Sequence, residues 1–170
     1  MTYRRLTAWL ALLLALPLLA ACAAEQQAVA EETALRQSLV NWVILDQKPA
    51  GIDVSFPEGQ TLARTPTIVI QDDGSPANRA LKLANHDIAI LDPTSIRRRA
   101  DEQGDFPYLR FDRVQLTGDK ANVRLSLAWA LSQATLQTGR GPSDSGGVEL
   151  ILRRRGGQWV AERLIALWRA

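Results

Sequence analysis

Apolar residues near the N-terminus predict an amphipathic helix. Between Glu31 and Lys48 they recur with helical spacing, at Leu35, Leu39, Trp42 and Val43. Pro49 and Gly51 follow, and these residue types end helices. Because only one face of this helix is apolar, we expect it to lie against a sheet.

The middle of the chain predicts two short strands and a second helix. Residues 67–71 and 87–91 are short runs rich in β-branched residues, which is typical of strands. Asp92 then precedes Pro93, the arrangement of an N-cap residue followed by proline at the first helical position. We therefore predict a short helix over residues 93–103.

The last third of the chain predicts two antiparallel hairpins. In the first, residues 109–117 and 120–131 flank Gly118-Asp119, a two-residue turn of the kind that needs positive φ. In the second, residues 147–155 and 158–167 flank Gly156-Gly157. Residues 138–147, between the hairpins, are dense in Gly and Ser and predict a mobile loop.

The register of the first hairpin requires a bulge. Counting back from the turn places Val114 opposite Val123, but the next pair on that face would place Asp112 against Leu125. We predict an extra residue near Asp112, because it restores Phe111 opposite Leu125. In the second hairpin the same counting places an arginine against an indole, which predicts a cation–π contact between Arg154 and Trp159.

The N-terminus has the three-part layout of a secretory signal. Arg4 and Arg5 precede an apolar run from Leu6 to Leu19, and two small residues precede Cys22. The segment Leu-Ala-Ala-Cys at 19–22 resembles the lipobox of bacterial lipoproteins. This resemblance implies a signal peptide over residues 1–21 and a lipid on Cys22, the first residue of the mature chain.

A membrane-spanning anchor is the alternative for this segment. Pro17 inside the apolar run and the polar residues after Cys22, which include no Lys/Arg cluster, argue against it. We expect residues 22–32 to form the lipidated Cys and a flexible tether, and residues 33–170 a single globular domain. The lipid implies the bacterial cell envelope. In a Gram-negative cell we expect the outer membrane, facing the periplasm, because Ala23 replaces the Asp that resembles an inner-membrane retention signal.

Composition excludes several function classes. The chain has 20 Lys and Arg against 18 Asp and Glu, and loss of Arg4 and Arg5 with the leader makes the mature protein near neutral. We therefore expect no nucleic-acid partner. Lipidation uses the only cysteine, and a single histidine leaves too few usual zinc ligands, so we expect no metal and no cofactor. Arg97–Arg99 and Arg153–Arg155 are candidate contacts for phosphate or lipid headgroups, but we interpret both runs as exposed to solvent.

Together these elements predict an α+β domain with its helices on one face of a curved antiparallel sheet: an N-terminal helix and a short second helix. The hairpin 114–129 around Gly118-Asp119, and the ending 148–168 with Arg-Gly-Gly-Gln-Trp at 155–159, resemble the nuclear transport factor 2-like superfamily, also called SnoaL-like or ketosteroid-isomerase-like. The resemblance implies a cone-shaped pocket between the sheet and the helices.

Fold alone does not choose a function for such a pocket. Catalytic members of that superfamily use an Asp base with Tyr or acidic donors, a motif not matched here. We expect a non-enzymatic domain that binds a small apolar ligand or an envelope protein; the alternative is an isomerase- or dehydratase-like enzyme. An Asp or His beside Tyr108 in a deep cavity would favour the enzyme, and a cavity filled by Leu and Trp would favour a scaffold. The candidate pocket residues are His86, Asp105, Phe106, Tyr108 and Trp129, with Asp87 as a further candidate acid.

Overall fold

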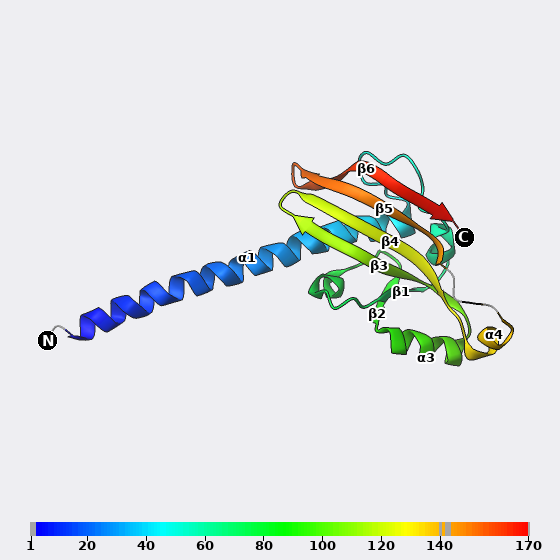
Figure 1. Cartoon of the computed structure of the whole chain (residues 1–170), viewed down its shortest axis with the longest axis horizontal. Coiled ribbons are helices and arrows are strands. Elements are labelled where there is room, and N and C mark those ends of the chain that lie inside the picture. Colours follow the sequence, from blue (N-terminus) through cyan, green and yellow to red (C-terminus); the bar gives the residue numbers. More distant parts are fainter. Residues whose placement is uncertain (1–2, 140, 142–143, 170) are drawn as a thin grey trace.

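The structure is a computed structural model that describes residues 3–139, 141 and 144–169, with the side chains of 23–139, 141 and 145–169. A six-stranded sheet of order β2-β1-β3-β4-β5-β6 lies over the C-terminal part of a long helix, α1 (Figure 1). The described elements, in chain order, are α1 (Tyr3–Leu45), α2 (Gly59–Ala63), β1 (Thr67–Gln71), the 3-10 helix η1 (Pro76–Ala80), β2 (Asp87–Leu91), α3 (Pro93–Gln103), β3 (Phe106–Thr117), β4 (Lys120–Ala130), α4 (Gln133–Gln137), β5 (Asp144–Arg155) and β6 (Gln158–Arg169).

The sheet is mixed, which confirms the α+β class and corrects the expectation of an antiparallel sheet. Strand β1 runs parallel to β2, with Ile68 opposite Ile88, and parallel to β3, with Ile70 opposite Leu109. The remaining pairs are antiparallel. A parallel pair needs a crossover connection, and residues 72–86, which include η1, supply it between β1 and β2.

The first hairpin has the predicted register. Val114 lies opposite Val123 and Phe111 opposite Leu125, with the register shift between Phe111 and Arg113. Asp112 is therefore the extra residue of the predicted bulge. Strand β3 begins at Phe106, three residues before the predicted start.

The second hairpin pairs as predicted next to its turn, but its arginine has another partner. Two register shifts farther from the turn, between Glu149 and Leu150 and between Ile151 and Leu152, were not predicted. Arg154 lies opposite Trp159, while its guanidinium forms an ion pair with Glu31 at 2.6 Å. Among the described side chains, it is Arg124 that lies over an indole, 4.8 Å from the ring centre of Trp168. Strand β5 begins at Asp144, inside the predicted loop; residues 140 and 142–143 of that loop lie outside the described residues.

Helix α1 is longer than predicted. It runs unbroken from Tyr3 to Leu45, so the flexible tether expected over residues 22–32 is corrected to a helical segment. Residues 23–32 are mostly Ala, Gln and Glu, which are strong helix formers, and the chain has no Gly or Pro between Pro17 and Pro49. In the part of the chain whose side chains are described, no helix is both long and apolar enough to cross a membrane.

The main core lies between α1 and the sheet. Leu35, Leu39 and Trp42 of α1 have no exposed surface, and they pack in one cluster with buried residues of β1, β3, β4 and β5. The Trp42 ring meets Phe56 edge-on, with 5.7 Å between ring centres, and its Nε1 donates to the carbonyl oxygen of Val54 at 3.2 Å. The predicted apolar face of this helix is therefore the one that is buried.

Helix α3 covers the opposite face of the sheet, so the expectation of helices on a single face is wrong. Ile96 and Ala100 of α3 pack against Val69 of β1, whereas the neighbouring Ile68 faces α1. Successive residues of a strand point to opposite faces, and both faces of β1 are apolar. The predicted N-cap is confirmed, since Asp92 accepts hydrogen bonds from the amides that begin α3.

A buried arginine ties α1 to the loop after β1. Arg36 is 2% exposed, and its guanidinium donates to Glu32 at 2.7 Å, to Asn78 Oδ1 at 2.9 Å and to Asp73 Oδ2 at 2.8 Å. Its central carbon also lies 4.5 Å from the ring centre of Phe111. A desolvated charge needs such a full set of partners, so these contacts constrain helix, loop and sheet together.

The ionised form of Asp73 is favoured in the folded protein. Burial raises its pKa, but the hydrogen bond and positive charge of Arg36, with hydrogen bonds from Ser75 and Asn78, outweigh this effect. The pKa of Asp73 therefore lies below its ordinary value of 3.8.

We predict that Arg36→Ala destabilises the fold strongly. Removing the guanidinium leaves Asp73 and Asn78 without their main partner, and we expect a loss of about 3 kcal/mol in the free energy of unfolding. The carboxylates of Asp73 and Glu32 keep 28% and 24% exposure, which places this value at the lower end of the range for broken buried pairs. Denaturant unfolding measures it, with Arg98→Ala, an exposed arginine on α3, as the control. Equal effects of the two variants would contradict the anchoring role.

We also predict that Asp73→Asn removes part of the acid sensitivity of the fold. Because the pKa of Asp73 is lowered in the folded state, its stabilising contribution is complete above the unfolded value of 3.8 and is lost as pH falls through the folded value. Unfolding free energies measured from about pH 7 to about pH 2 should fall less steeply in this variant than in the unmodified protein. Parallel curves would show that Asp73 contributes nothing to acid unfolding.

Candidate functional site

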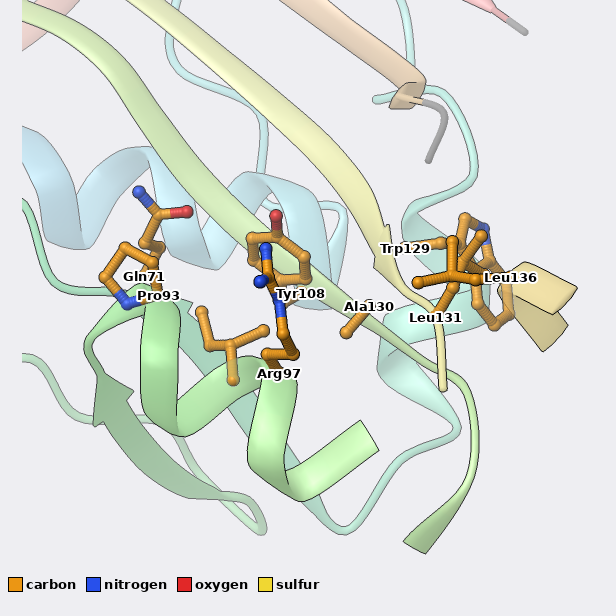
Figure 2. A pocket seen from close by; sticks show the side chains of 9 residues that line it. Gln71, Pro93, Arg97, Tyr108, Trp129, Ala130, Leu131 and Leu136 are labelled. Atoms are coloured by element: carbon orange, nitrogen blue, oxygen red, sulfur yellow. The ribbon is translucent and has the colours of Figure 1, made fainter. Parts of the chain in front are cut away.

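A hollow of about 170 Å³ lies between α3, the sheet and α4. Figure 2 shows the side chains around it: Gln71, Arg97 and Tyr108 towards one end, and Trp129 and Leu136 towards the other. Apolar atoms of Trp129 and Leu136 form one wall. The polar groups of the first three residues give this hollow hydrogen-bonding and charged side chains beside an apolar wall.

Five elements position these side chains: β1, α3, β3, β4 and α4. Gln71 is the last residue of β1, and Tyr108 points from β3 to the α3 side of the sheet, as Phe106 does two residues earlier. Arg97 follows the buried Ile96 on α3, which places it at the rim of the hollow. The exposed guanidinium of Arg97 gives the rim a positive charge.

The described lining of this hollow contains no acid, histidine or cysteine. Tyr108 is the residue in it whose side chain could serve as a general acid or base. Arg97, Tyr108 and Gln71 provide hydrogen-bond donors, which suits a small anionic or carbonyl group. Trp129 is half-buried and offers an apolar surface beside it.

The structure divides the predicted pocket residues between different places. Tyr108 and Trp129 line the hollow just described, whereas Asp105 and Phe106 line a second one of about 190 Å³ at the C-terminal end of α3. In the second hollow Arg99 lies over Phe106, with 5.4 Å between its central carbon and the ring centre. Helix α3 supplies residues to both hollows, from its first turns and from its last turn respectively.

His86 lies at neither hollow. It directly precedes β2, and its Nδ1 is 3.0 Å from the carbonyl oxygen of Thr65. The adjacent Asp87, the first residue of β2, is exposed. This contact fixes the imidazole against the backbone that leads into β1. The prediction that His86 shares a pocket with Tyr108 is therefore corrected.

Asp105 holds the start of α4. Its two carboxylate oxygens accept hydrogen bonds from the Ser132 amide at 2.8 Å and from Thr135 Oγ1 at 2.9 Å. Asp101, on the last turn of α3, accepts from the Gln133 amide at 2.6 Å. Helix α4 was not predicted from the sequence, and these acids from α3 and the following loop are what position it.

The space between α1 and the sheet, where the family resemblance implied a cone-shaped pocket, is filled by side chains. Trp42, Leu35 and Leu39 enter it from α1 and meet Leu125 and Leu150 of the sheet, all with no exposed surface. Among the described side chains, no group of three or more His, Cys, Asp and Glu is placed to hold a metal ion.

Sequence reasoning missed Arg97 and Gln71 as lining residues. Arg97 belongs to the run Arg97–Arg99, whose members point in different directions around a helix, and only Arg97 of this run reaches the first hollow. Its place directly after the buried Ile96 was the available signal. Gln71 was only the polar end of a predicted strand, and nothing in its neighbours indicates a site.

Comparisons with known proteins found no match: no family model, no curated protein and no solved structure is similar to this chain.

Proposed function

We propose that this protein is a lipid-anchored protein of the bacterial cell envelope whose domain binds a protein partner and carries out no catalysis. One observation carries the proposal: Trp42, Leu35 and Leu39 fill the space in which a ligand or substrate of such a fold would lie. Because the interior of the domain is filled, only its outer surface is available for binding. Contact between outer surfaces is the way in which proteins bind other proteins.

The anchor in this proposal is a lipid on Cys22, placed at the start of a helical spacer. Residues 23–28 are exposed and belong to α1, and the helix enters the domain near Leu35. At about 1.5 Å per residue, the spacer holds the domain roughly 20 Å from the lipid. In a Gram-negative cell this domain faces the periplasm from the outer membrane.

The proposal extends to the fold family, a nuclear transport factor 2-like cone. Two consecutive hairpins, β3–β4 and β5–β6, that lie over an N-terminal helix support this assignment. The parallel pairing of β1 and the position of α3 on the other face of the sheet are departures from the layout expected of such a cone.

Small-ligand binding is the second candidate, and the hollow at Arg97 and Trp129 is the observation that favours it. Its volume of about 170 Å³ is below the 300–1,000 Å³ that is typical of ligand pockets, so it accommodates only a few non-hydrogen atoms. The enzyme alternative has weaker support, because Asp105 is engaged by Ser132 and Thr135, and His86 by Thr65.

We predict that Cys22→Ala releases the protein from membranes or leaves it as an uncleaved precursor, because no thiol remains to carry the lipid. Fractionation of cells labelled with a radioactive fatty acid measures both outcomes. Ala24→Ser, just after the lipobox, serves as the control and should be labelled and membrane-bound like the unmodified protein. Labelled, membrane-bound Cys22→Ala would refute the anchor.

We further predict that the full-length protein, extracted from its membranes in mild detergent, carries no small organic molecule in native mass spectrometry. Its mass should correspond to lipidated polypeptide, alone or with another polypeptide. A bound small molecule that is lost in Arg97→Ala and retained in Arg98→Ala would establish the second candidate instead. Arg98 is a matched control because it is the next residue of α3 and does not line the hollow.

A further inference from the structure

Three polar side chains line one end of the hollow between α3, the sheet and α4. Among the described residues, the side chains of Gln71, Arg97 and Tyr108 have no hydrogen-bond or ion-pair partner. Figure 2 shows all three towards the same end of the hollow, with Trp129 and Leu136 towards the other. An amide, a guanidinium and a phenol therefore remain available there to one incoming group.

The acid that could neutralise Arg97 on its own helix contacts another element. A side chain four residues farther along a helix is a natural ion-pair partner, and for Arg97 this residue is Asp101. The Asp101 carboxylate instead accepts from the Gln133 amide at 2.6 Å, at the start of α4. Within the described part of the chain Arg97 has no ion pair. Its positive charge thus stays at the rim of the hollow.

Helix α4 supplies part of the apolar end of the same hollow. Leu136 of α4 and the half-buried Trp129 of β4 both line this end. Asp101 and Asp105 hold α4 in place through hydrogen bonds from residues at its start. The contact that leaves Arg97 without Asp101 therefore also positions the apolar wall of the hollow.

A carboxylate is the group that fits the polar end best. Its two oxygens match the paired N–H groups of a guanidinium, and the phenol and the amide nitrogen add further donors. Arg97 is the only cation among the described lining residues, and this lining has no acid, so it balances one negative charge. A phosphate dianion would keep a second negative charge without a cationic partner.

The apolar end adds a second requirement. The volume of about 170 Å³ is that of one amino-acid residue, so the occupant must carry an apolar group close to its carboxylate. Asp and Glu side chains supply the charge without such a group. The last residue of a protein chain supplies both when its side chain is apolar, because the carboxylate and the side chain share one Cα atom. Capture of a chain end is a recurring mode of peptide recognition.

We propose that this hollow binds the C-terminal residue of a protein partner whose chain ends in a medium-sized apolar residue such as leucine. The terminal carboxylate pairs with Arg97 and accepts from Tyr108 and from the Gln71 amide. The terminal side chain packs on Trp129 and Leu136. The inference rests on the proposed protein-binding role and gives that role a site.

A chain end gains more from this hollow than a free acid of the same size. The residues that precede it lie outside the hollow and add contacts on the surface of the domain, and these contacts are absent for a free acid. The terminal residue then acts as a buried anchor within a larger interface, which is how a small pocket contributes to protein binding.

The hollow at the other end of α3 does not fit the same ligand. Asp105 lines it, and a terminal carboxylate there would meet a second negative charge. Its arginine, Arg99, already donates to Gln103 at 3.0 Å and lies over the Phe106 ring. The site for a chain end is therefore assigned to the hollow at Arg97 alone.

Synthetic peptides test the chemistry of the ligand. N-acetyl-Gly-Gly-Ser-Leu with a free carboxylate should bind the full-length protein in mild detergent with a Kd on the order of 1 mM, measured by NMR shift changes. The same peptide with a C-terminal amide should bind about tenfold more weakly, because the charge-assisted hydrogen bonds are lost. A free-carboxylate peptide that ends in serine should bind about fivefold more weakly. Equal binding of the acid and the amide would overturn the proposal.

Three variants test the residues. Arg97→Ala should weaken binding of the leucine peptide by about tenfold, and Tyr108→Phe, which keeps the ring, by about threefold. Arg98→Ala is the matched control and should bind like the unmodified protein, because Arg98 does not line the hollow. Arg97 and Arg98 are both exposed, so these replacements leave the core untouched. An unchanged affinity in Arg97→Ala would overturn the proposal.

N-acetylleucine separates a chain end from a free acid. If it binds while the leucine tetrapeptide does not, the hollow takes small acids, and the chain-end proposal is overturned in favour of the small-ligand candidate. Binding of the tetrapeptide at least as tightly as N-acetylleucine supports the chain end.

Photo-crosslinking in the membranes of the host tests the partner itself. A benzophenone amino acid at the exposed Gln137, directly after Leu136, should crosslink to the last few residues of another polypeptide, as mapped by mass spectrometry. The same group at the exposed Thr117 should not give this product. A crosslink to an internal segment, or none, would overturn the chain-end proposal. A complex with another polypeptide in native mass spectrometry would then still support the proposed protein-binding role.

Discussion

One buried guanidinium determines how the helix, the loop and the sheet are placed relative to one another. Arg36 sits on the buried side of α1 and is bound by Glu32 one turn earlier and by Asp73 and Asn78 beyond β1, with the Phe111 ring beneath it. A charge removed from water is tolerated only when its partners stay in place. The apolar packing of α1 is not directional, whereas these hydrogen bonds are, and they select one position of the helix over the sheet.

This placement has a consequence for function. Because α1 lies where it does, Trp42 and its apolar neighbours occupy the interior, and the polar side chains that recognition needs are left at the surface. The hollow at Arg97 and Tyr108 is such a surface feature. In the proposed function, a lipid anchor that leads into α1 serves a domain that meets other molecules through its surface.

The features that were predicted correctly depend on residues close together in the sequence. The bulge at Asp112 was predicted by counting residue pairs back from the turn at Gly118. The N-cap at Asp92 was predicted because Pro93 directly follows it. The candidate site was harder, because Asp105 and Tyr108 are close in sequence yet reach different hollows at the two ends of α3. The extension of α1 over residues 23–32 could also have been predicted, because these residues are mostly the strong helix formers Ala, Gln and Glu. The expectation of a flexible tether did not take this helix propensity into account.

The sequence by itself determined the α+β class, both hairpins, the register of the first hairpin and the apolar face of α1, because these depend on residues close together in the chain. The two register shifts of the second hairpin were not predicted. Only the tertiary structure decided that β1 pairs in parallel with two strands, that α3 takes the opposite face, and that Asp73 and Asn78 are the partners of Arg36. Each of these joins segments that lie far apart in the chain. Apolar periodicity predicts which face of a helix or strand is buried, but it does not predict which other segment packs against that face.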